Sequence, residues 1–306
     1  MQWKTEIDTA RNRIAKYVVQ TPVFQSSGLG LDFPIELKLE HLQHTGSFKA
    51  RGAFNTLLST NVPAAGVVAA SGGNHGAAVA YAARSLGHRA SIFVPELAGP
   101  AKIALIERTG ADLTVVPGEY ADAMAQAQSH EASSGAMQVH AYDASATVVG
   151  QGTVLAEWDA QGLADHTVFI AVGGGGLIAG AMAWAQGARK IIAVEPETSC
   201  ALAQARHSGT PVDVAVSGVA ANALGARRIG KICFELAQQQ DIACVTVPDE
   251  AIVDAQTRLW QAHRLLVEPA GACALAALTG GAYKPARGEK IAVLVCGGNI
   301  APDPVG

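Results

Sequence analysis

The chain has 306 residues, of which 49% are hydrophobic and 16% charged, and its formal net charge is −4. This composition is typical of a compact α/β protein, and the length is enough for two domains of about 150 residues each. A weakly acidic chain is not expected to bind nucleic acid, and no apolar run reaches the ~18 residues that a membrane span needs. Because the amino terminus also has no apolar signal core, we expect a cytoplasmic protein without membrane contact.

Helical and strand periodicities alternate along most of the chain, which predicts crossover units and parallel sheets. The expected strands lie at 35–40, 66–71, 89–94, 112–116, 136–140, 167–172, 190–195, 243–247 and 290–296. The expected helices lie near 4–18, 74–86, 145–162, 198–208 and 225–238, others begin near 47, 100, 120 and 176, and two more precede the last strand. Apolar strands with little polar alternation are typical of sheets covered on both faces, so we expect three layers.

Lys49 follows Phe48 and stands among small residues near an expected helix start. Burial in such a place lowers the pKa of a lysine amine, and a neutral amine can attack an aldehyde to form a Schiff base. Most lysines are solvated surface charges, so this pattern indicates chemistry only in the company of other motifs.

A second motif follows the strand at 66–71 and opens the next helix. It consists of Ser71, Gly72, Gly73, Asn74 and His75. The glycines let a loop approach a ligand closely, and the amides at a helix start favour an anion, so a substrate carboxylate would fit here. Asn74 could instead simply cap the helix, and a histidine such as His75 more often makes a structural hydrogen bond.

A run of glycines links the strand at 167–172 to another helix. Its members are Gly173, Gly174, Gly175 and Gly176. Their amides could cradle a phosphate. The run also contains G-x-G-x-x-A, and Glu195 ends the next strand about 20 residues later, as a dinucleotide fingerprint requires. A nicotinamide-dependent oxidoreductase is therefore a rival interpretation.

The five cysteines are odd in number, scattered and never spaced as C-x-x-C, which predicts neither a disulfide framework nor a zinc site. Four of them are expected to be buried small side chains. Cys296 differs because it ends the last apolar strand and is followed by two glycines and Asn299. Ligands of open α/β folds bind at the carboxyl edge of the sheet, where a thiol can face a heterocycle.

The segments GSFKARGA, SGGNHG, GGGGLIAG, VEPAGA and CGGN, in this order, resemble the serine/threonine dehydratase branch of the fold-type-II pyridoxal phosphate enzymes, which includes serine racemases. The resemblance runs over nearly the whole chain. It implies an α/β fold of two three-layer parallel-sheet domains, similar to tryptophan synthase β. We expect residues 1–65 and 141–306 to form a large cofactor-binding domain, with residues 66–140 inserted as a small one.

The resemblance also implies roles for single residues. The lysine of the S-F-K motif carries pyridoxal phosphate in this family, which implies Lys49, with Phe48 against the cofactor ring. Asn74 would contact the ring hydroxyl, and Cys296 would face the pyridine nitrogen. The phosphate would be held by the amides of Gly173, Gly174, Gly175 and Gly176. The expected substrate-binding residues are Ser71, Gly72, Gly73, Asn74 and His75.

The implied reaction is elimination of water from a small L-β-hydroxy amino acid such as threonine or serine, giving a 2-oxo acid and ammonia, with Lys49 taking the α-proton. The alternatives are a serine racemase, a dehydratase of a bulkier substrate such as phenylserine or hydroxyaspartate, the nicotinamide enzyme, and a silent binding protein. Serine racemases carry a hydroxyl where this chain has Gly72, so elimination without racemisation is expected. A homo-oligomer, most simply a dimer, is expected as well.

Two departures from the family limit these implications. Residues 117–134 contain no Lys or Arg that could clamp a substrate carboxylate, so the loop at 71–75 must carry most of that binding. Near residues 215–218, an acidic residue often found in members with a bound divalent cation is replaced by Ser217. We therefore expect no metal ion, although Glu195 remains available as one ligand.

Overall fold

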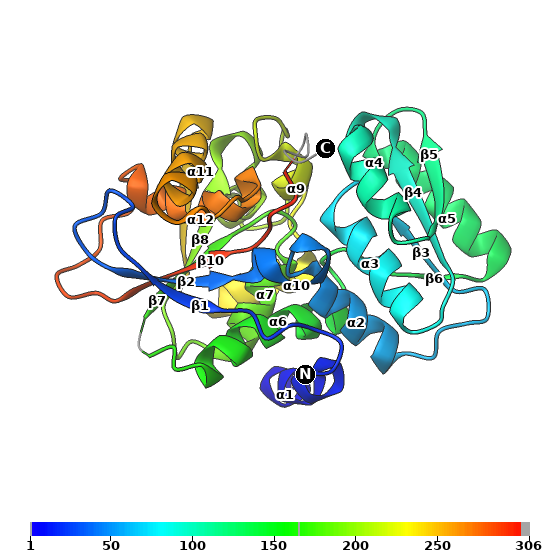
Figure 1. Ribbon diagram of the computed structural model, residues 1–306, viewed down its shortest axis with the longest axis horizontal. Coiled ribbons are helices and arrows are strands. Elements are labelled where there is room, and N and C mark those ends of the chain that lie inside the picture. Colours follow the sequence, from blue (N-terminus) through cyan, green and yellow to red (C-terminus); the bar gives the residue numbers. More distant parts are fainter. Residues whose placement is uncertain (1, 165, 301–306) are drawn as a thin grey trace.

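The computed structural model describes residues 2–164 and 166–300, and these contain two β-sheets. The six-stranded sheet has the order β1-β2-β10-β7-β8-β9, and the four-stranded sheet has the order β5-β4-β3-β6. The larger sheet is built from β1 (Val23–Ser26), β2 (Ile35–Leu39), β7 (Thr167–Ala171), β8 (Ile191–Pro196), β9 (Ala243–Val247) and β10 (Ile291–Val295). The smaller sheet is built from β3 (Val67–Ala70), β4 (Ala90–Pro95), β5 (Asp112–Val116) and β6 (Met137–Gln138). Figure 1 shows the larger sheet on the left and the smaller one on the right.

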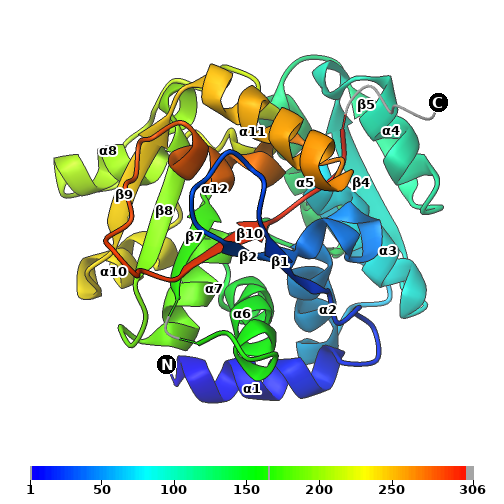
Figure 2. The same ribbon diagram turned by 60° about the vertical axis from the view of Figure 1, so that its left-hand side comes forward.

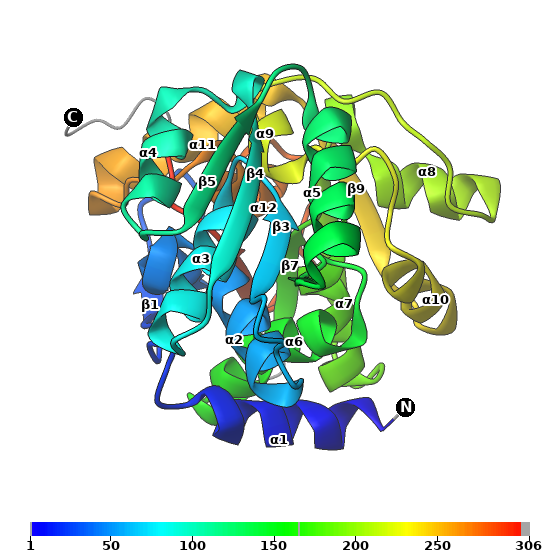
Figure 3. The same ribbon diagram turned by 90° about the vertical axis from the view of Figure 1, so that its right-hand side faces the viewer.

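Helices cover both faces of the smaller sheet, whose strands are all parallel. Figure 3 shows α3 (Asn74–Ser85) and α4 (Pro100–Glu107) on one face and α5 (Tyr120–Ser134) on the other. Side chains alternate across a strand, and Val67 and Ala69 of β3 accordingly pack in the core with α3, whereas Val68 and Ala70 pack with α5. This double covering explains why the strand is apolar throughout.

Helices also cover both faces of the larger sheet. Figure 2 shows α11 and α12 on one side of the sheet and α1, α6 and α7 on the other. These and the remaining helices are α1 (Trp3–Ile14), α6 (Ser145–Ala160), α7 (Gly176–Ala185), α8 (Ala201–Ser208), α9 (Ala221–Leu224), α10 (Lys231–Gln239), α11 (Asp249–His263) and α12 (Pro269–Thr279). The predicted three-layer α/β architecture is confirmed. No helix within the described residues is long and apolar enough to cross a membrane.

The helix α2 (Lys49–Ser59) lies between the two sheets (Figure 1). Its Ala53 and Phe54 belong to the same core as β3 and α3, while Asn55 donates a hydrogen bond to the carbonyl of Ala146 on α6. Lys49, at the start of α2, therefore stands where the two sheet units meet. The division of the chain into residues 1–65 with 141–306 and residues 66–140 stays a proposal.

The larger sheet differs from the prediction at its edge. The strand β1 was not expected, and it pairs antiparallel with β2, so that Val23 lies opposite Lys38. The connection contains Gly28 and Gly30, both with positive φ (85° and 76°), which lets the chain reverse sharply. The four residues of β1, VFQS, form neither an apolar run nor an alternation of apolar and polar residues, which is why the sequence analysis did not predict the hairpin.

Two helix boundaries were also wrong. The first helix ends at Ile14 rather than near residue 18, and Tyr17 beyond it stacks on Phe54 with ring centroids 5.3 Å apart. The helix expected over 225–238 begins only at Lys231. Its start is set by Asp143, whose Oδ1 accepts a hydrogen bond from the Ile232 amide at 3.0 Å. Both ends are thus decided by contacts with distant segments.

Candidate active site

A cavity opens where the glycine run, the start of α2 and the start of α3 meet. Its lining includes Phe48, Lys49, Asn74, Tyr142, Gly173, Gly174, Gly175, Gly176, Leu224, Glu268, Ala270 and Cys296. The structure thereby brings together the lysine, the asparagine, the glycines and the cysteine that the sequence motifs singled out. The cavity lies at the carboxyl ends of β7 and β10, where open α/β sheets bind their ligands.

Lys49 is the first residue of α2, and its side chain reaches into this cavity. The Nζ atom donates a hydrogen bond to the Ala141 carbonyl at 2.7 Å and lies 5.2 Å from the centroid of the Phe48 ring. Burial lowers the pKa of the Lys49 amine to about 8, while Cys296 and Glu268, where they are ionised, act in the opposite direction. The amine is therefore partly neutral near physiological pH, as attack on an aldehyde requires.

The end of β10 holds the segment in front of Lys49 in place. Ser47 forms an isolated antiparallel bridge with Gly297, and the Phe48 amide donates to the Cys296 carbonyl at 3.2 Å. A second backbone hydrogen bond joins the same two segments, since the Gly298 amide donates to the Gly46 carbonyl at 2.9 Å. The lysine and the cysteine are thus fixed relative to each other by backbone hydrogen bonds.

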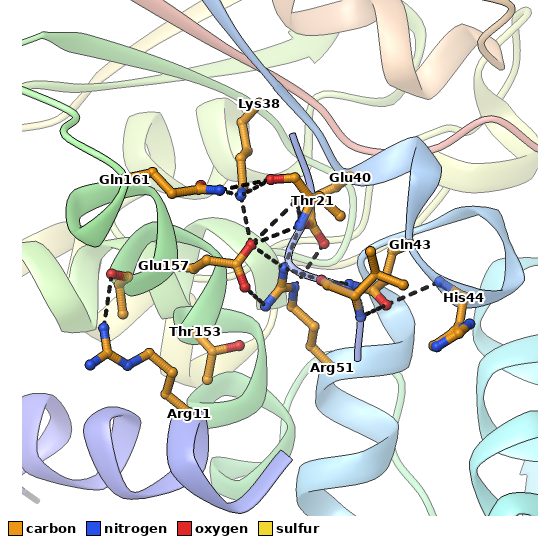
Figure 4. A network of polar contacts seen from close by, with 12 residues as sticks. Arg11, Thr21, Lys38, Glu40, Gln43, His44, Arg51, Thr153, Glu157 and Gln161 are labelled. Carbon is orange, nitrogen blue, oxygen red and sulfur yellow. Dashed lines mark hydrogen bonds and ion pairs between the residues drawn. The ribbon is translucent and has the colours of Figure 1, made fainter. Parts of the chain in front are cut away.

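A buried network of charges anchors α2 from its other side (Figure 4). The Arg51 guanidinium, 1% exposed, lies between two carboxylates. Its NH2 group donates to Glu40 Oε1 at 2.7 Å and to Glu157 Oε1 at 2.9 Å, and its other nitrogens bond the remaining carboxylate oxygens. Arg51 thereby connects α2 to the end of β2 and to α6. Such bidentate pairs fix orientation as well as distance.

Lys38 completes this network. Its Nζ donates to Glu157 Oε1 at 2.6 Å, to Gln161 Oε1 at 2.6 Å and to the Thr21 carbonyl at 2.8 Å. All three protons of the ammonium group are used, although burial lowers the pKa of Lys38. The two cations, Lys38 and Arg51, balance the charges of Glu40 and Glu157, so the network is neutral as a whole.

The glycine run leads directly into α7. Gly175, at the N-cap of the helix, has φ of 90°, and no side chain among the described residues caps this helix start. The first amides of a helix have no partner within the helix, so these N–H groups point toward the cavity end of α7 as an anion site. A side chain at position 174 would collide with the ring of Tyr142, so the loop must be glycine to pass beneath that ring.

The second motif forms the start of α3. Ser71 Oγ accepts a hydrogen bond from the Gly73 amide at 3.2 Å, and no side chain among the described residues caps the helix. Asn74 donates from Nδ2 to Glu268 Oε1 at 2.6 Å. His75 donates from Nε2 to the Val139 carbonyl at 2.8 Å, and burial lowers the pKa of its imidazole to about 3. This imidazole is neutral and is held by the backbone near β6.

The environment of Gly72 bears on the question of racemisation. A side chain at this position would collide with Cβ of Ala98 and would lie 3.1 Å from Val94 Cγ1. A hydroxyl could therefore enter here only after the loop or the segment at 96–98 had moved. The packing of the smaller sheet unit thus favours glycine at position 72 over a residue whose side chain could donate a proton.

The Cys296 thiol is 2% exposed and donates a hydrogen bond to the Ala270 carbonyl at 3.3 Å. Burial, aided by the neighbouring Glu268 carboxylate, raises the pKa of Cys296 well above its usual range. Burial therefore favours the uncharged thiol near neutral pH.

Glu195 has a structural role in the fold. Its Oε1 accepts from the Leu202 amide and its Oε2 from the Ala203 amide, each at 2.8 Å, so the carboxyl group caps α8. Burial raises its pKa to about 7. Each oxygen thus accepts one backbone hydrogen bond, which gives Glu195 a structural role at the start of α8. Within the described residues, no group of three or more His, Cys, Asp and Glu is placed to hold a metal ion.

Two cavity residues were missed by the sequence analysis. Glu268 stood in the quoted VEPAGA segment but received no role, although it is 4% exposed and bonds Asn74. The available signal was an acidic residue directly before Pro269, at an expected helix start within a motif of the family. Tyr142 lies over the glycine run, and nothing in its local sequence pointed to this contact.

Comparisons with known proteins agree with this geometry. Residues 14–297 match the family described as "Pyridoxal-phosphate dependent enzyme". The chain belongs to this family. Its members depend on pyridoxal phosphate, which is therefore the cofactor of this chain. The chain is an enzyme of the dehydratase and racemase group within the family.

The individual relatives fall into that group. The chain is 36% identical over 302 residues to "Phenylserine dehydratase" of Ralstonia pickettii. This alignment covers 94% of this chain and 90% of the relative. It is 33% identical to "L-threonine dehydratase biosynthetic IlvA" of Burkholderia multivorans. That alignment covers 90% of this chain but only 53% of the relative, so the chain spans about half of its length. The solved structure of maize serine racemase superimposes with a TM-score of 0.92 at 30% identity, covering 98% of this chain and 94% of that one.

The residues of the cavity fit the cofactor. A partly neutral lysine amine faces the cavity as an aldehyde requires, and the uncapped start of α7 offers amides to a phosphate. The side-chain amide of Asn74 and the thiol of Cys296 line the same space. When bound, pyridoxal phosphate supplies an electron sink for the carbanion formed at the α-carbon of an amino acid.

Proposed function

We propose that this enzyme eliminates water from a small L-β-hydroxy amino acid, threonine or serine first, and releases a 2-oxo acid and ammonia. The observation that carries the proposal is the Lys49 amine, held by the Ala141 carbonyl at 2.7 Å with a pKa lowered to about 8, in a cavity that also contains the start of α7. Such an amine can bind the cofactor and afterwards accept the α-proton. The relatives named as dehydratases support the choice of reaction.

Each cavity residue has a task in this proposal. Lys49 holds the cofactor through Nζ with Phe48 beside it, and the amides of the glycine run at 173–176 bind the phosphate. Asn74 contacts the ring hydroxyl, and the uncharged thiol of Cys296 leaves the pyridine nitrogen largely unprotonated, since a thiol is a weak partner and brings no charge. The substrate carboxylate binds to the amides at the start of α3, residues 71–75.

A dehydratase of a bulkier substrate is the second candidate. The relative named phenylserine dehydratase favours it, because it matches 94% of this chain. A serine racemase is supported by the likeness to the maize protein, but the packing around Gly72 leaves no room for a proton donor there without a rearrangement. A dimer and a cytoplasmic location stay predictions.

The attachment site is tested by reducing the holoenzyme with borohydride and mapping the labelled peptide. The expected label is on Lys49. A label on another lysine would overturn the site, and a purified protein without visible absorbance from the cofactor would favour a silent binding protein.

The substrate is tested by measuring 2-oxo acid release from serine, threonine, phenylserine and hydroxyaspartate. We expect the highest kcat/KM for threonine or serine. In the same experiment with L-serine, chiral chromatography should show D-serine forming far more slowly than pyruvate. Equal rates would make the enzyme a racemase, and a clear preference for phenylserine would establish the second candidate.

A further inference from the structure

Asn74 is held from both sides by residues of the larger sheet unit. Its Nδ2 donates to Glu268 Oε1 at 2.6 Å, and its Oδ1 accepts from Asn299 Nδ2 at 2.7 Å. Asn299 also donates to the Thr45 carbonyl at 2.8 Å. A carboxylate only accepts hydrogen bonds, so Glu268 decides which end of the amide faces it. Because the Asn74 carbonyl oxygen already accepts from Asn299, its second N–H is the group left to donate to a ligand in the cavity that Asn74 lines.

Glu268 also stands beside the reactive amine. It lines the same cavity as Lys49 and is 4% exposed. Glu268 and Cys296 are the two acidic groups that act on the Lys49 amine, and burial favours the uncharged thiol of Cys296 by raising its pKa well above the usual range. The negative charge next to the Lys49 amine is therefore that of Glu268.

The surroundings of Glu268 are shaped to receive a charged carboxylate. Glu268 is the N-cap residue of α12, where the helix dipole favours negative charge. Its amide donates to the Gly297 carbonyl at 3.3 Å, and any side chain at position 297 would collide with its Oε1. Glycine at 297 thus leaves the space that lets the carboxylate reach Asn74.

We propose that Glu268 is a positioning residue of the reaction: its side chain orients the Asn74 amide toward the cofactor and places a negative charge in the cavity that Lys49 lines. The inference rests on the proposed function in that Lys49 is the lysine that holds the cofactor. Glu268 then has two separable effects. Orienting Asn74 needs the length of its side chain, whereas acting on the Lys49 amine needs only its charge.

The charge is tested with Glu268→Gln, which keeps the shape and the ability to accept from Asn74. The readout is the pH dependence of acylation of Lys49 by acetic anhydride in the full-length, cofactor-free protein, followed by peptide mapping. We expect the midpoint to fall by about one pH unit or more. The matched control is Glu197→Gln, an exposed carboxylate outside the cavity, which should leave the midpoint unchanged. An unchanged midpoint in Glu268→Gln would overturn the charge role.

The reach is tested with Glu268→Asp, which keeps the charge but withdraws it by one methylene group from Asn74. The midpoint for Lys49 should stay near that of the wild type, while the dissociation constant for pyridoxal phosphate rises about tenfold, the equivalent of about 1.4 kcal/mol. An unchanged affinity would overturn the orienting role. If Glu268→Gln does not fold, a comparison of Glu268→Asp with the wild type still decides this part.

The two tests of Glu268 can succeed or fail independently of the proposed function. Acylation reports on the Lys49 amine whether or not that lysine carries the cofactor. A cofactor mapped to another lysine would refute the proposed function while the shift in the acylation midpoint could still be read.

Discussion

On one face of α2, Arg51 lies between two carboxylates and shares Glu157 with Lys38, and every charge there has several partners. On the opposite face, two residues earlier along the helix, Lys49 is held by one backbone carbonyl and Cys296 by another. The first arrangement pairs each charged group with several partners and fixes their relative orientation. The second leaves a lysine amine near its titration point. The same helix therefore carries a structural region, whose charges are paired, and a chemical one, where burial keeps the Lys49 amine reactive.

The charged network should dominate stability. Arg51→Met leaves Glu40 and Glu157 buried with only Lys38 for compensation, and we expect the free energy of unfolding to fall by about 3–5 kcal/mol. The matched control is Arg228→Met, which removes an exposed ion pair with Asp213 and should change stability by about 0–1 kcal/mol. Urea unfolding measures both. Equal effects of the two variants would show that the network does not anchor α2.

Burial of the Lys49 amine, unlike the charged network, should lower the stability of the folded chain below about pH 10. In the cofactor-free protein its pKa is about 8, below the usual value of 10.5, so between these pH values the unfolded chain holds a proton that the folded chain has released. Stability should rise with pH across this window, by up to about 3 kcal/mol from Lys49 alone. Urea unfolding at pH 7.5 and pH 10 should show this contribution in the wild type and its loss in Lys49→Met, which should also abolish activity. Parallel pH profiles for the two proteins would contradict the shifted pKa.

A side chain at position 72 tests how closely the smaller sheet unit is packed around the cavity. Gly72→Ser must displace Ala98, and we expect a loss of about 1–3 kcal/mol in unfolding free energy with no gain in D-serine formation. Gly72→Ala is the control, since it has the same collision without a hydroxyl. D-serine formed by the serine variant alone would show that the loop can yield and that the hydroxyl reaches the α-carbon.

Cys296 should show the smallest effects, and they should differ by charge. Cys296→Ser keeps an uncharged donor for the Ala270 carbonyl and should change kcat/KM by less than about tenfold, or 1.4 kcal/mol. Cys296→Asp buries a second carboxylate near Glu268 and should lower kcat/KM by about tenfold or more. Full activity in the Asp variant would refute the uncharged partner for the pyridine nitrogen.

Local sequence was sufficient for the elements that depend on local periodicity. Runs of apolar residues at 67–70, 167–171 and 291–295 predicted strands covered on both faces, and the confirmed α/β fold contains them. The motifs around Lys49, Asn74, the glycine run and Cys296 identified residues that the structure places around one cavity. This was possible because strand ends and helix starts of parallel crossover units meet at one edge of a sheet.

Tertiary structure decided the remainder, because the partners concerned are far apart along the chain. Lys38 lies in a strand whose sequence alternates apolar and charged residues. It is nevertheless fully buried, because Glu157, 119 residues later in the chain, pairs with it from a helix. The sequence did not predict that the Glu195 carboxyl group caps α8, nor that Glu268 bonds Asn74, which lies 194 residues earlier. The charge of a side chain can be read from the sequence. Which group neutralises it, and whether it remains reactive, depends on contacts that only the folded chain makes.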